Sequence, residues 1–330
     1  EIYQNHNMDL DISKVYVSMH INHYCLYDFS KCKHKLDLAT EAYANSVTKD
    51  SIHEINLLYH KVDLLALTHS DFNQAIKIVD SAISLSLENN MYFLERLYRL
   101  KALLNFQSKD YREFKSSIEK SLILCKTSNM STKVNVYLAM ACGENYFGNY
   151  SNALDHTIHT QKLIMQLLNF DVDPSKEELF INRVMSIDMQ MNTTFETEQL
   201  YKQIYSCLIE KAIAYHYLND TRKAIALLAS IDFDFFLSKF TLIPNRAYFW
   251  ENKLSYSKIL SHSNKTEEAI KIATEIKDHL LEINDFYDLY KTYELLGDLY
   301  KKMNDYENAF ISLHSAHQFM KENMNFSFDM

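Results

Sequence analysis

The stretch from Asp285 to Lys321 decides the fold, and it reads DFYDLYKTYELLGDLYKKMNDYENAFISLHSAHQFMK. Apolar and small residues recur at intervals of three and four, which is the period of a helix. A polar break over residues 303–306 separates two such helices, the first carrying Tyr293, Leu296, Gly297 and Tyr300 and the second carrying Ala309, Leu313 and Ala316. The pattern predicts a helical hairpin. We expect Gly297 to face Ala309 and to let the two helices approach closely.

Weaker copies of this hairpin fill most of the chain. Each copy has a polar residue, then Asp or Asn, an aromatic residue and, three positions later, a small or apolar anchor, with some substitutions. The anchors are 39 to 45 residues apart except for one interval of 71, and they are Cys32, Ala75, Phe114, Ala153, Ala224, Ala269 and Ala309. The long interval leaves room for one further unit. Since a single hairpin cannot bury its apolar face, the copies must stack.

The order aromatic, Leu-Gly, Tyr, Ala, apolar and Ala in residues 293–316 resembles the tetratricopeptide repeat. The resemblance implies an all-α, right-handed superhelix of seven to eight tetratricopeptide-like hairpins, with residues 1–330 forming one domain. The spacing also approaches that of HEAT repeats, so a HEAT solenoid is the structural alternative. We favour the tetratricopeptide form because the signature positions have its spacing within the best unit.

Composition excludes several classes of protein. Three Gly and two Pro in 330 residues are too few for the turns of a β-sandwich or for a Rossmann phosphate loop. A net charge of −9 argues against direct binding of nucleic acid by this chain. Five scattered cysteines, and the lack of a long apolar run, predict a cytoplasmic protein without a membrane span. No P-loop, GxSxG or GxGxxG motif is present, so we expect no enzyme activity and no cofactor.

Two segments interrupt the repeat. Residues 168–197 contain Asp173-Pro174, a helix start, and we expect a helix from Ser175 to Met189, a loop at 191–194 and a hinge in the superhelix. Residues 232–244 form a second atypical linker that carries four phenylalanines. We expect these aromatic side chains to fill the gap between neighbouring hairpins.

Cysteine and histidine spacings do not predict a metal site. His23, Cys25, Cys32 and His34 form H-x-C-x6-C-x-H, whereas structural zinc sites usually have closer cysteine pairs. The pairs His156/His159 and His314/His317 would each need a third ligand. We therefore expect Cys32 to be a buried thiol.

Candidate binding residues follow from counting back from each anchor to the first helix of its hairpin. The residues placed on the concave face and chosen as a peptide-binding set are Arg96, Arg99, Phe106, Asn135, Asn145 and Tyr146. A carboxamide can pair with any peptide backbone, and a guanidinium can hold a carboxylate. The same count places Lys291, Glu294, Asp298, Lys301 and Lys302 on this face in the last hairpin.

Repeat length, glycine poverty and richness in Asn, Tyr and Lys also resemble the Rap, Rgg, NprR, PlcR and PrgX group of peptide-sensing regulators from Gram-positive bacteria and phages. That resemblance implies a sensor that binds a short signalling peptide and controls transcription or a protein partner. Any N-terminal helix-turn-helix domain would lie outside this chain. Self-association as a homodimer is a further expectation. A passive scaffold for protein assembly is the alternative, and a phosphatase-like regulator is a weaker one.

Overall fold

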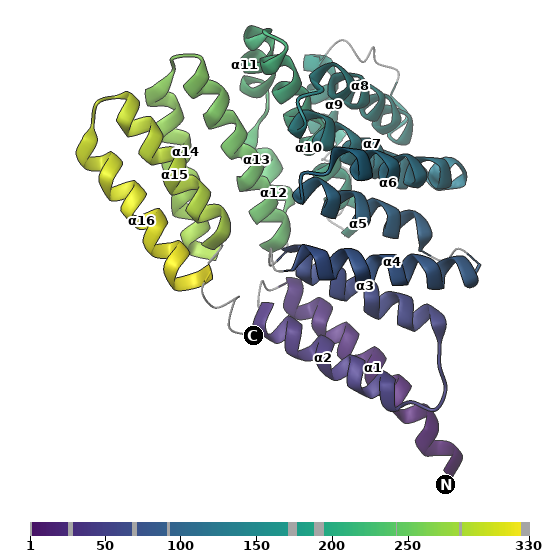
Figure 1. Cartoon of the computed structure of the whole chain (residues 1–330). Helices are drawn as coiled ribbons and strands as arrows, with labels where there is room; N and C mark the ends of the chain where they lie inside the picture. The colour runs from purple at the N-terminus through teal and green to yellow at the C-terminus, as the bar shows by residue number, and fades with distance from the viewer. Residues whose placement is uncertain are drawn as a thin grey trace. The chain divides into compact units, whose positions relative to one another are not determined.

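The computed structural model describes residues 2–25, 29–67, 71–90, 93–170, 177–187, 195–241, 243–283 and 286–324, and these residues form helices and turns without a strand (Figure 1). The helices are α1 (Ile2–Cys25), α2 (Phe29–Asn45), α3 (Ser51–Leu67), α4 (Phe72–Glu88), α5 (Leu94–Gln107), α6 (Tyr111–Leu124), the 3-10 turn η1 (Cys125–Thr127), α7 (Met130–Tyr146), α8 (Tyr150–Leu167), α9 (Glu177–Ile187), α10 (Phe195–Tyr217), α11 (Thr221–Ala229), α12 (Phe233–Lys239), α13 (Ile243–His262), α14 (Thr266–Ile283), α15 (Phe286–Lys302) and α16 (Tyr306–Met324).

The chain divides into two compact units, Glu1–Ala139 and Met140–Met330. The boundary falls within α7, so the first part of this helix belongs to the first unit and its last two turns belong to the second. The hinge expected within 168–197 stays a prediction, because residues 171–176 and 188–194 lie outside the described ranges. The predicted loop at 191–194 and the predicted helix start at Asp173-Pro174 also lie there. Between these gaps, α9 confirms the helix expected from Ser175 to Met189.

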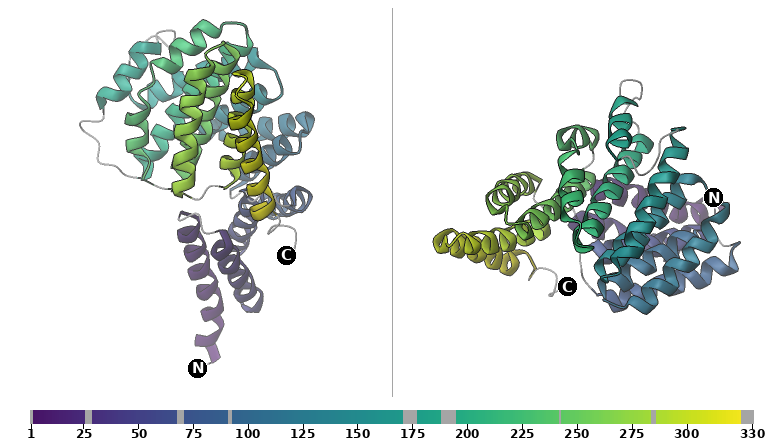
Figure 2. Two further views of the ribbon diagram at one scale, coloured as in Figure 1. Left: turned by 90° about the vertical axis from the view of Figure 1, so that its left-hand side faces the viewer. Right: turned by 90° about the horizontal axis from the view of Figure 1, so that it is seen from above.

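The helices form the expected hairpins, and the all-α repeat fold is confirmed. In the first unit α1 packs on α2, α3 on α4 and α5 on α6, and in the second α10 packs on α11, α13 on α14 and α15 on α16. Each predicted anchor is at most 5% exposed, and this holds for Cys32, Ala75, Phe114, Ala153, Ala224, Ala269 and Ala309. Figure 1 shows α13, α14, α15 and α16 next to one another, Figure 2 shows the same helices from two further sides, and α13 contacts both α14 and α15.

The recurring polar turn has a backbone explanation. Its first residue adopts a left-handed conformation, with φ between 60° and 82° at Lys109, Gly148, Asn219, Asn264 and Asn304. Asn and Gly adopt this conformation at the least cost, and it ends the first helix. The next residue caps the second helix: Asp110 Oδ1 accepts a hydrogen bond from the Glu113 N–H at 3.0 Å, and Asp220 Oδ1 accepts one from the Lys223 N–H at 3.3 Å. The left-handed backbone therefore explains the polar first residue of the turn, and helix capping explains the Asp that follows it.

The phenylalanine-rich segment at 232–244 is more ordered than a linker, because Phe233–Lys239 forms the short helix α12. Phe236 and Phe240 are at most 1% exposed. They surround the buried ring of Tyr205 on α10, with centroids 5.5 and 6.3 Å away, and Phe249 on α13 stacks on Tyr205 at 4.9 Å. The aromatic side chains thus fill the gap between neighbouring hairpins, as the sequence predicts.

The partner of Gly297 differs from the expected one. A Cβ atom added at Gly297 would lie 2.6 Å from Cγ of Leu313, one helical turn beyond Ala309. The side chain nearest to Gly297 is therefore Leu313, one turn from the expected Ala309, while the reason for a glycine is unchanged. Leu313 on α16 occupies the space that any side chain on α15 would need at this position.

Replacing Gly297 with leucine should lower the free energy of unfolding of the second unit by about 1–3 kcal/mol, because the new side chain overpacks the contact with Leu313. Fluorescence of the single tryptophan, Trp250, during urea denaturation reports on this unit, since Trp250 is buried on α13. Combining Gly297→Leu with Leu313→Ala should recover part of the loss. An unchanged urea midpoint in Gly297→Leu would contradict the packing.

Candidate functional site

The first-unit candidates lie on α5. Arg99 and Phe106 are seven residues apart, so they share one helical face two turns apart. Arg96 is exposed, and its guanidinium lies 4.6 Å from the centre of the Phe93 ring. Arg99 is half-buried, and its Nε donates to Glu95 Oε1 at 3.3 Å. Part of the Arg99 charge is therefore already balanced by Glu95.

Tyr59 of α3 adds an aromatic surface beside these arginines. Its ring packs edge-on against Phe93, with centroids 5.5 Å apart. Burial and the nearby Asp63 charge raise the pKa of Tyr59 to about 12, although the charges of Arg99 and Arg96 oppose this rise. The phenol thus stays neutral at all ordinary pH values. Sequence reasoning did not select Tyr59, although its aromatic ring on a first helix was a usable signal.

The remaining candidates lie on α7, on either side of the unit boundary. Asn135 is half-buried and belongs to the first unit, whereas Asn145 and Tyr146 belong to the second. Tyr146 is 48% exposed, and its ring packs edge-on against Phe147 at 5.2 Å. The described structure therefore groups Arg96, Arg99 and Phe106 on α5, and Asn145 with Tyr146 at the end of α7.

Asn145 is the candidate with the most defined surroundings. It is 7% exposed, and its Nδ2 donates to the Glu210 backbone oxygen at 2.8 Å and to Glu210 Oε2 at 2.7 Å. The side-chain oxygen, Oδ1, is buried and accepts no hydrogen bond within the described part of the chain. Glu210 thus accepts both hydrogen bonds that the Asn145 amide donates. These bonds fix the orientation of Oδ1, a buried acceptor that has no donor.

Glu210 of α10 is a site residue that sequence reasoning missed. It is 8% exposed, and burial raises the pKa of its carboxyl group, while hydrogen bonds from Asn145 and the Cys142 thiol oppose that shift. The nearby Glu251 charge adds to the rise. Burial also raises the pKa of Cys142 well above its usual value. The available signal was Glu210-Lys211, a charged pair within an otherwise apolar run.

Tyr248 on α13 completes this cluster. Its hydroxyl shares a 2.7 Å hydrogen bond with the Ser206 hydroxyl, and burial raises its pKa strongly. Helices α7, α10 and α13 therefore each place polar side chains in one cluster, in which Asn145, Ser206 and Glu210 are buried and Cys142 and Tyr248 are partly buried. Such a cluster can bind polar backbone groups, because its members already hold one another in fixed orientations.

No group of three or more His, Cys, Asp or Glu side chains in the described ranges is arranged to hold a metal ion. Cys32 is fully buried, and its thiol donates to the His20 backbone oxygen at 3.6 Å, which confirms the predicted buried thiol. The side chain of Cys25 lies outside the described residues. None of the described helices combines the length and the apolar content that a membrane span requires.

No protein-family model and no curated protein matches the sequence. Among solved structures, a Rap protein complexed with competence and sporulation factor matches 94% of this chain and 75% of its own, with a TM-score of 0.63 and 12% identity. NprR in complex with its cognate peptide NprX matches 98% of this chain and 83% of its own, with a TM-score of 0.62 and 13% identity. BtubC from P. vanneervenii matches 78% of this chain and 93% of its own, with a TM-score of 0.51 and 13% identity.

These likenesses define the class of fold: the chain is an all-α helical-repeat protein of the tetratricopeptide type. Within that class, it has the fold of the Rap and NprR structures over most of its length. The fold resemblance stated from the sequence is confirmed. At 12–13% identity the likeness extends to the fold alone and carries no residue roles.

Proposed function

We propose that this chain is a peptide-sensing regulatory domain, which binds a short signalling peptide and controls transcription or a protein partner in response. The proposal includes a cytoplasmic location, a non-enzymatic role and no direct contact with nucleic acid. Two of the structures with the same fold contain a bound signalling factor or peptide. In this chain, the observation that carries the proposal is the buried acceptor of Asn145.

A peptide backbone supplies the donor that Asn145 lacks. A buried oxygen without a partner costs about 1–3 kcal/mol, and a peptide N–H that reaches Asn145 Oδ1 would remove that cost on binding. The geometry is fixed in advance, because Nδ2 is held by Glu210. The exposed ring of Tyr146 on the next position can cover an apolar peptide side chain.

The first-unit residues form a second proposed set of peptide contacts. Arg96 and Arg99 offer guanidinium groups to a peptide carboxylate, Phe106 offers an aromatic surface, and the Asn135 amide offers both a donor and an acceptor. Arg99 would have to exchange or share its contact with Glu95. The two sets lie in different units, so each is tested by its own variants.

Truncating Asn135 or Arg99 to alanine should weaken peptide binding by about 1–3 kcal/mol, because a polar group of the bound peptide loses its partner. Peptides retained by the protein after purification from its native host would be identified by mass spectrometry, synthesised and titrated calorimetrically. Lys109→Ala, at an exposed turn beyond α5, is the matched control and should bind as wild type. Equal affinity in all variants would exclude the first-unit set.

The second set requires a different variant, since Asn145 also has a structural role. Tyr146→Ala removes an exposed ring and should weaken the binding of a retained host peptide by about 1–3 kcal/mol, with little effect on the free energy of unfolding. A wild-type affinity for this variant would remove the end of α7 from the proposed site. If no host peptide is retained, or if none of the retained peptides binds when it is titrated, the peptide-sensing proposal fails.

A scaffold or self-associating role is the second candidate, and one observation favours it. Helix α16 carries exposed apolar side chains at Tyr306, Phe310, Ile311 and Leu313, which are 44% to 70% exposed. Exposed apolar side chains grouped on one helix suit a protein partner or a second copy of this chain. Sedimentation of wild type and Phe310→Glu would separate the cases: a dimer that the substitution dissolves supports self-association.

A further inference from the structure

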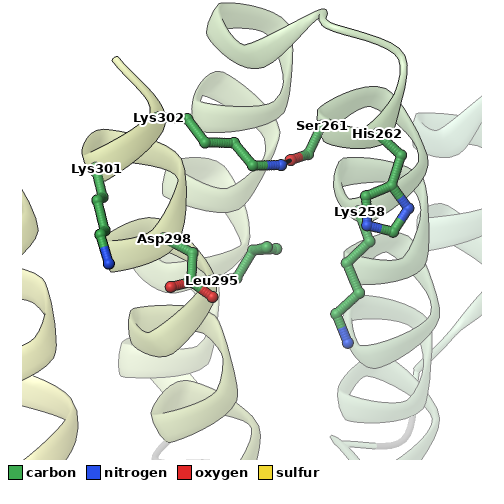
Figure 3. Close-up of a pocket in the computed structure, with 7 residues that line it drawn as sticks. All are labelled: Lys258, Ser261, His262, Leu295, Asp298, Lys301 and Lys302. Atoms are coloured by element: carbon green, nitrogen blue, oxygen red, sulfur yellow. Dashed lines mark hydrogen bonds between the residues drawn. The ribbon is translucent and has the colours of Figure 1, made fainter. Parts of the chain in front are cut away.

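A pocket of about 370 Å³ opens between α13 and α15 in the second unit (Figure 3). It is lined by Lys258, Ser261, His262, Leu295, Asp298, Lys301 and Lys302. Three lysines and a histidine thus accompany a single carboxylate, in a chain whose net charge is −9. The pocket is thus locally positive, whereas the sequence as a whole carries a net negative charge.

The lysines of this pocket lack acidic partners. Within the described residues, no carboxylate comes within ion-pair distance of Lys258, Lys301 or Lys302, and Asp298 pairs with none of them. Other lysines of the same unit do have such partners: Lys253 pairs with Glu275 at 2.7 Å, and Lys291 pairs with Glu251 at 3.1 Å. The pocket therefore brings together three ammonium groups that have no carboxylate within ion-pair distance in the described part of the chain.

Helix ends alone do not explain this arrangement. Basic residues in a last turn often stabilise the helix C-terminus, and His262, Lys301 and Lys302 occupy last turns. Lys302, however, reaches from α15 to α13, where its Nζ donates to Ser261 Oγ at 2.7 Å, as Figure 3 shows. Its ammonium group is held at the pocket by a neutral hydroxyl of the neighbouring helix.

His262 connects the pocket to α10. Its Nδ1 shares a 3.1 Å hydrogen bond with Nε2 of His216, and the two rings stack with centroids 5.2 Å apart. Burial lowers the pKa of His262, and the positive charges of Lys302 and Lys258 lower it further. Burial followed by the charge of Lys291 lowers the pKa of Lys258, although Glu251, Asp288 and Glu294 oppose this. Each positive charge thus disfavours the protonated form of its neighbours. A bound anion would favour the protonated forms and raise these pKa values.

We infer that this pocket binds an oxyanion, a carboxylate or phosphate group that is part of a molecule larger than a bare ion. Lysine ammonium groups act as point charges and accept either chemistry, whereas a planar arginine fork would have favoured bidentate binding. The volume lies in the range of roughly 300–1,000 Å³ that is typical of small-ligand sites. This inference goes beyond the proposed function, because it does not require the ligand to be a peptide.

The test is a titration of protein labelled with ¹³C at histidine, followed by NMR, with His262 assigned from a His262→Gln variant. The probes are pyrophosphate and succinate, each compared with chloride at the same ionic strength, since salt alone screens charges. We expect one or both probes to shift the His262 signal saturably and to raise its pKa. Saturation by pyrophosphate alone identifies a phosphate site, and saturation by succinate alone identifies a carboxylate site.

Variants locate the response. The double variant Lys258→Met/Lys302→Met should bind the active probe roughly tenfold more weakly or worse, as expected for two lost charge-assisted contacts. Lys271→Met removes an equal charge from an exposed position of α14 outside the pocket, and it should bind as wild type. The inference is overturned if neither probe saturates beyond the chloride effect, or if the double variant binds as wild type. Failure of peptide binding with retained anion binding would refute only the proposed function.

Discussion

Truncating Tyr205 to alanine should lower the free energy of unfolding of the second unit by about 3–5 kcal/mol, the range for removing a large buried ring. Tyr205 is fully buried on α10, and its ring contacts Phe236 and Phe240 from the α12 segment and Phe249 from α13. The α12 segment and α13 therefore both lose their contact with α10 at this position. The resulting cavity cannot close without moving helices that pack on other neighbours.

The hydroxyl of Tyr205 makes a smaller, separable contribution. It donates to the Phe249 backbone oxygen at 3.1 Å, so Tyr205→Phe should cost only about 1 kcal/mol. Urea denaturation monitored by Trp250 fluorescence measures both variants in the same unit. Leu281→Ala, at a 41% exposed position of α14, is the control and should change stability by about 0.5 kcal/mol or less. If Tyr205→Ala lowered the free energy of unfolding no more than Leu281→Ala does, the packing around Tyr205 would be contradicted.

Replacing Asn145 with leucine should lower the free energy of unfolding by about 1.5–3 kcal/mol, the cost of losing hydrogen bonds to a charged group. The amide makes two contacts with Glu210, and one of these supports the buried carboxylate. Without it, the pKa of Glu210 should rise further. The effect should depend on the Glu210 charge, so Asn145→Leu should cost less in a Glu210→Gln background. Equal costs in both backgrounds would contradict the coupling.

Glu210 also gives the second unit a defined pH dependence. Burial holds the pKa of its carboxyl above the ordinary value, so the folded state retains this proton at a pH where the unfolded chain has lost it. This contribution to stability is fully present below the pKa of the unfolded chain and is lost as pH rises through the folded pKa. Compared with wild type, Glu210→Gln should therefore gain in free energy of unfolding as the pH rises from 4 to 8.

Urea midpoints of wild type and Glu210→Gln between pH 4 and 8 measure this linkage. The difference between the two proteins should grow with pH and level off above the folded pKa. Asp155→Asn, at an exposed position of α8 in the same unit, serves as a control for loss of a negative charge alone. A difference between wild type and Glu210→Gln that does not change with pH would show that Glu210 titrates as an ordinary carboxylate.

The local elements of this protein were readable from its sequence because short-range rules set them. The turns required a left-handed residue followed by a helix cap, and this need appears in the sequence as Asn304-Asp305 and its copies. The anchor positions followed from helical periodicity, and all seven are buried. Poverty in Gly and Pro excluded other folds. These signals depend on residues close together in one hairpin, so they can be recognised without knowing how the hairpins pack.

Contacts between distant segments were decided by the tertiary structure alone. The side chain nearest to Gly297 is Leu313 rather than Ala309, because the axial offset of two packed helices depends on all their side chains together. Asn145 was selected as an exposed groove residue, yet it is buried against Glu210, 65 positions later. Lys258 and His262 join Lys302 only because α13 and α15 are neighbours. Sequence periodicity identifies the face on which a residue lies, whereas the charges and acceptors opposite it depend on how the hairpins stack.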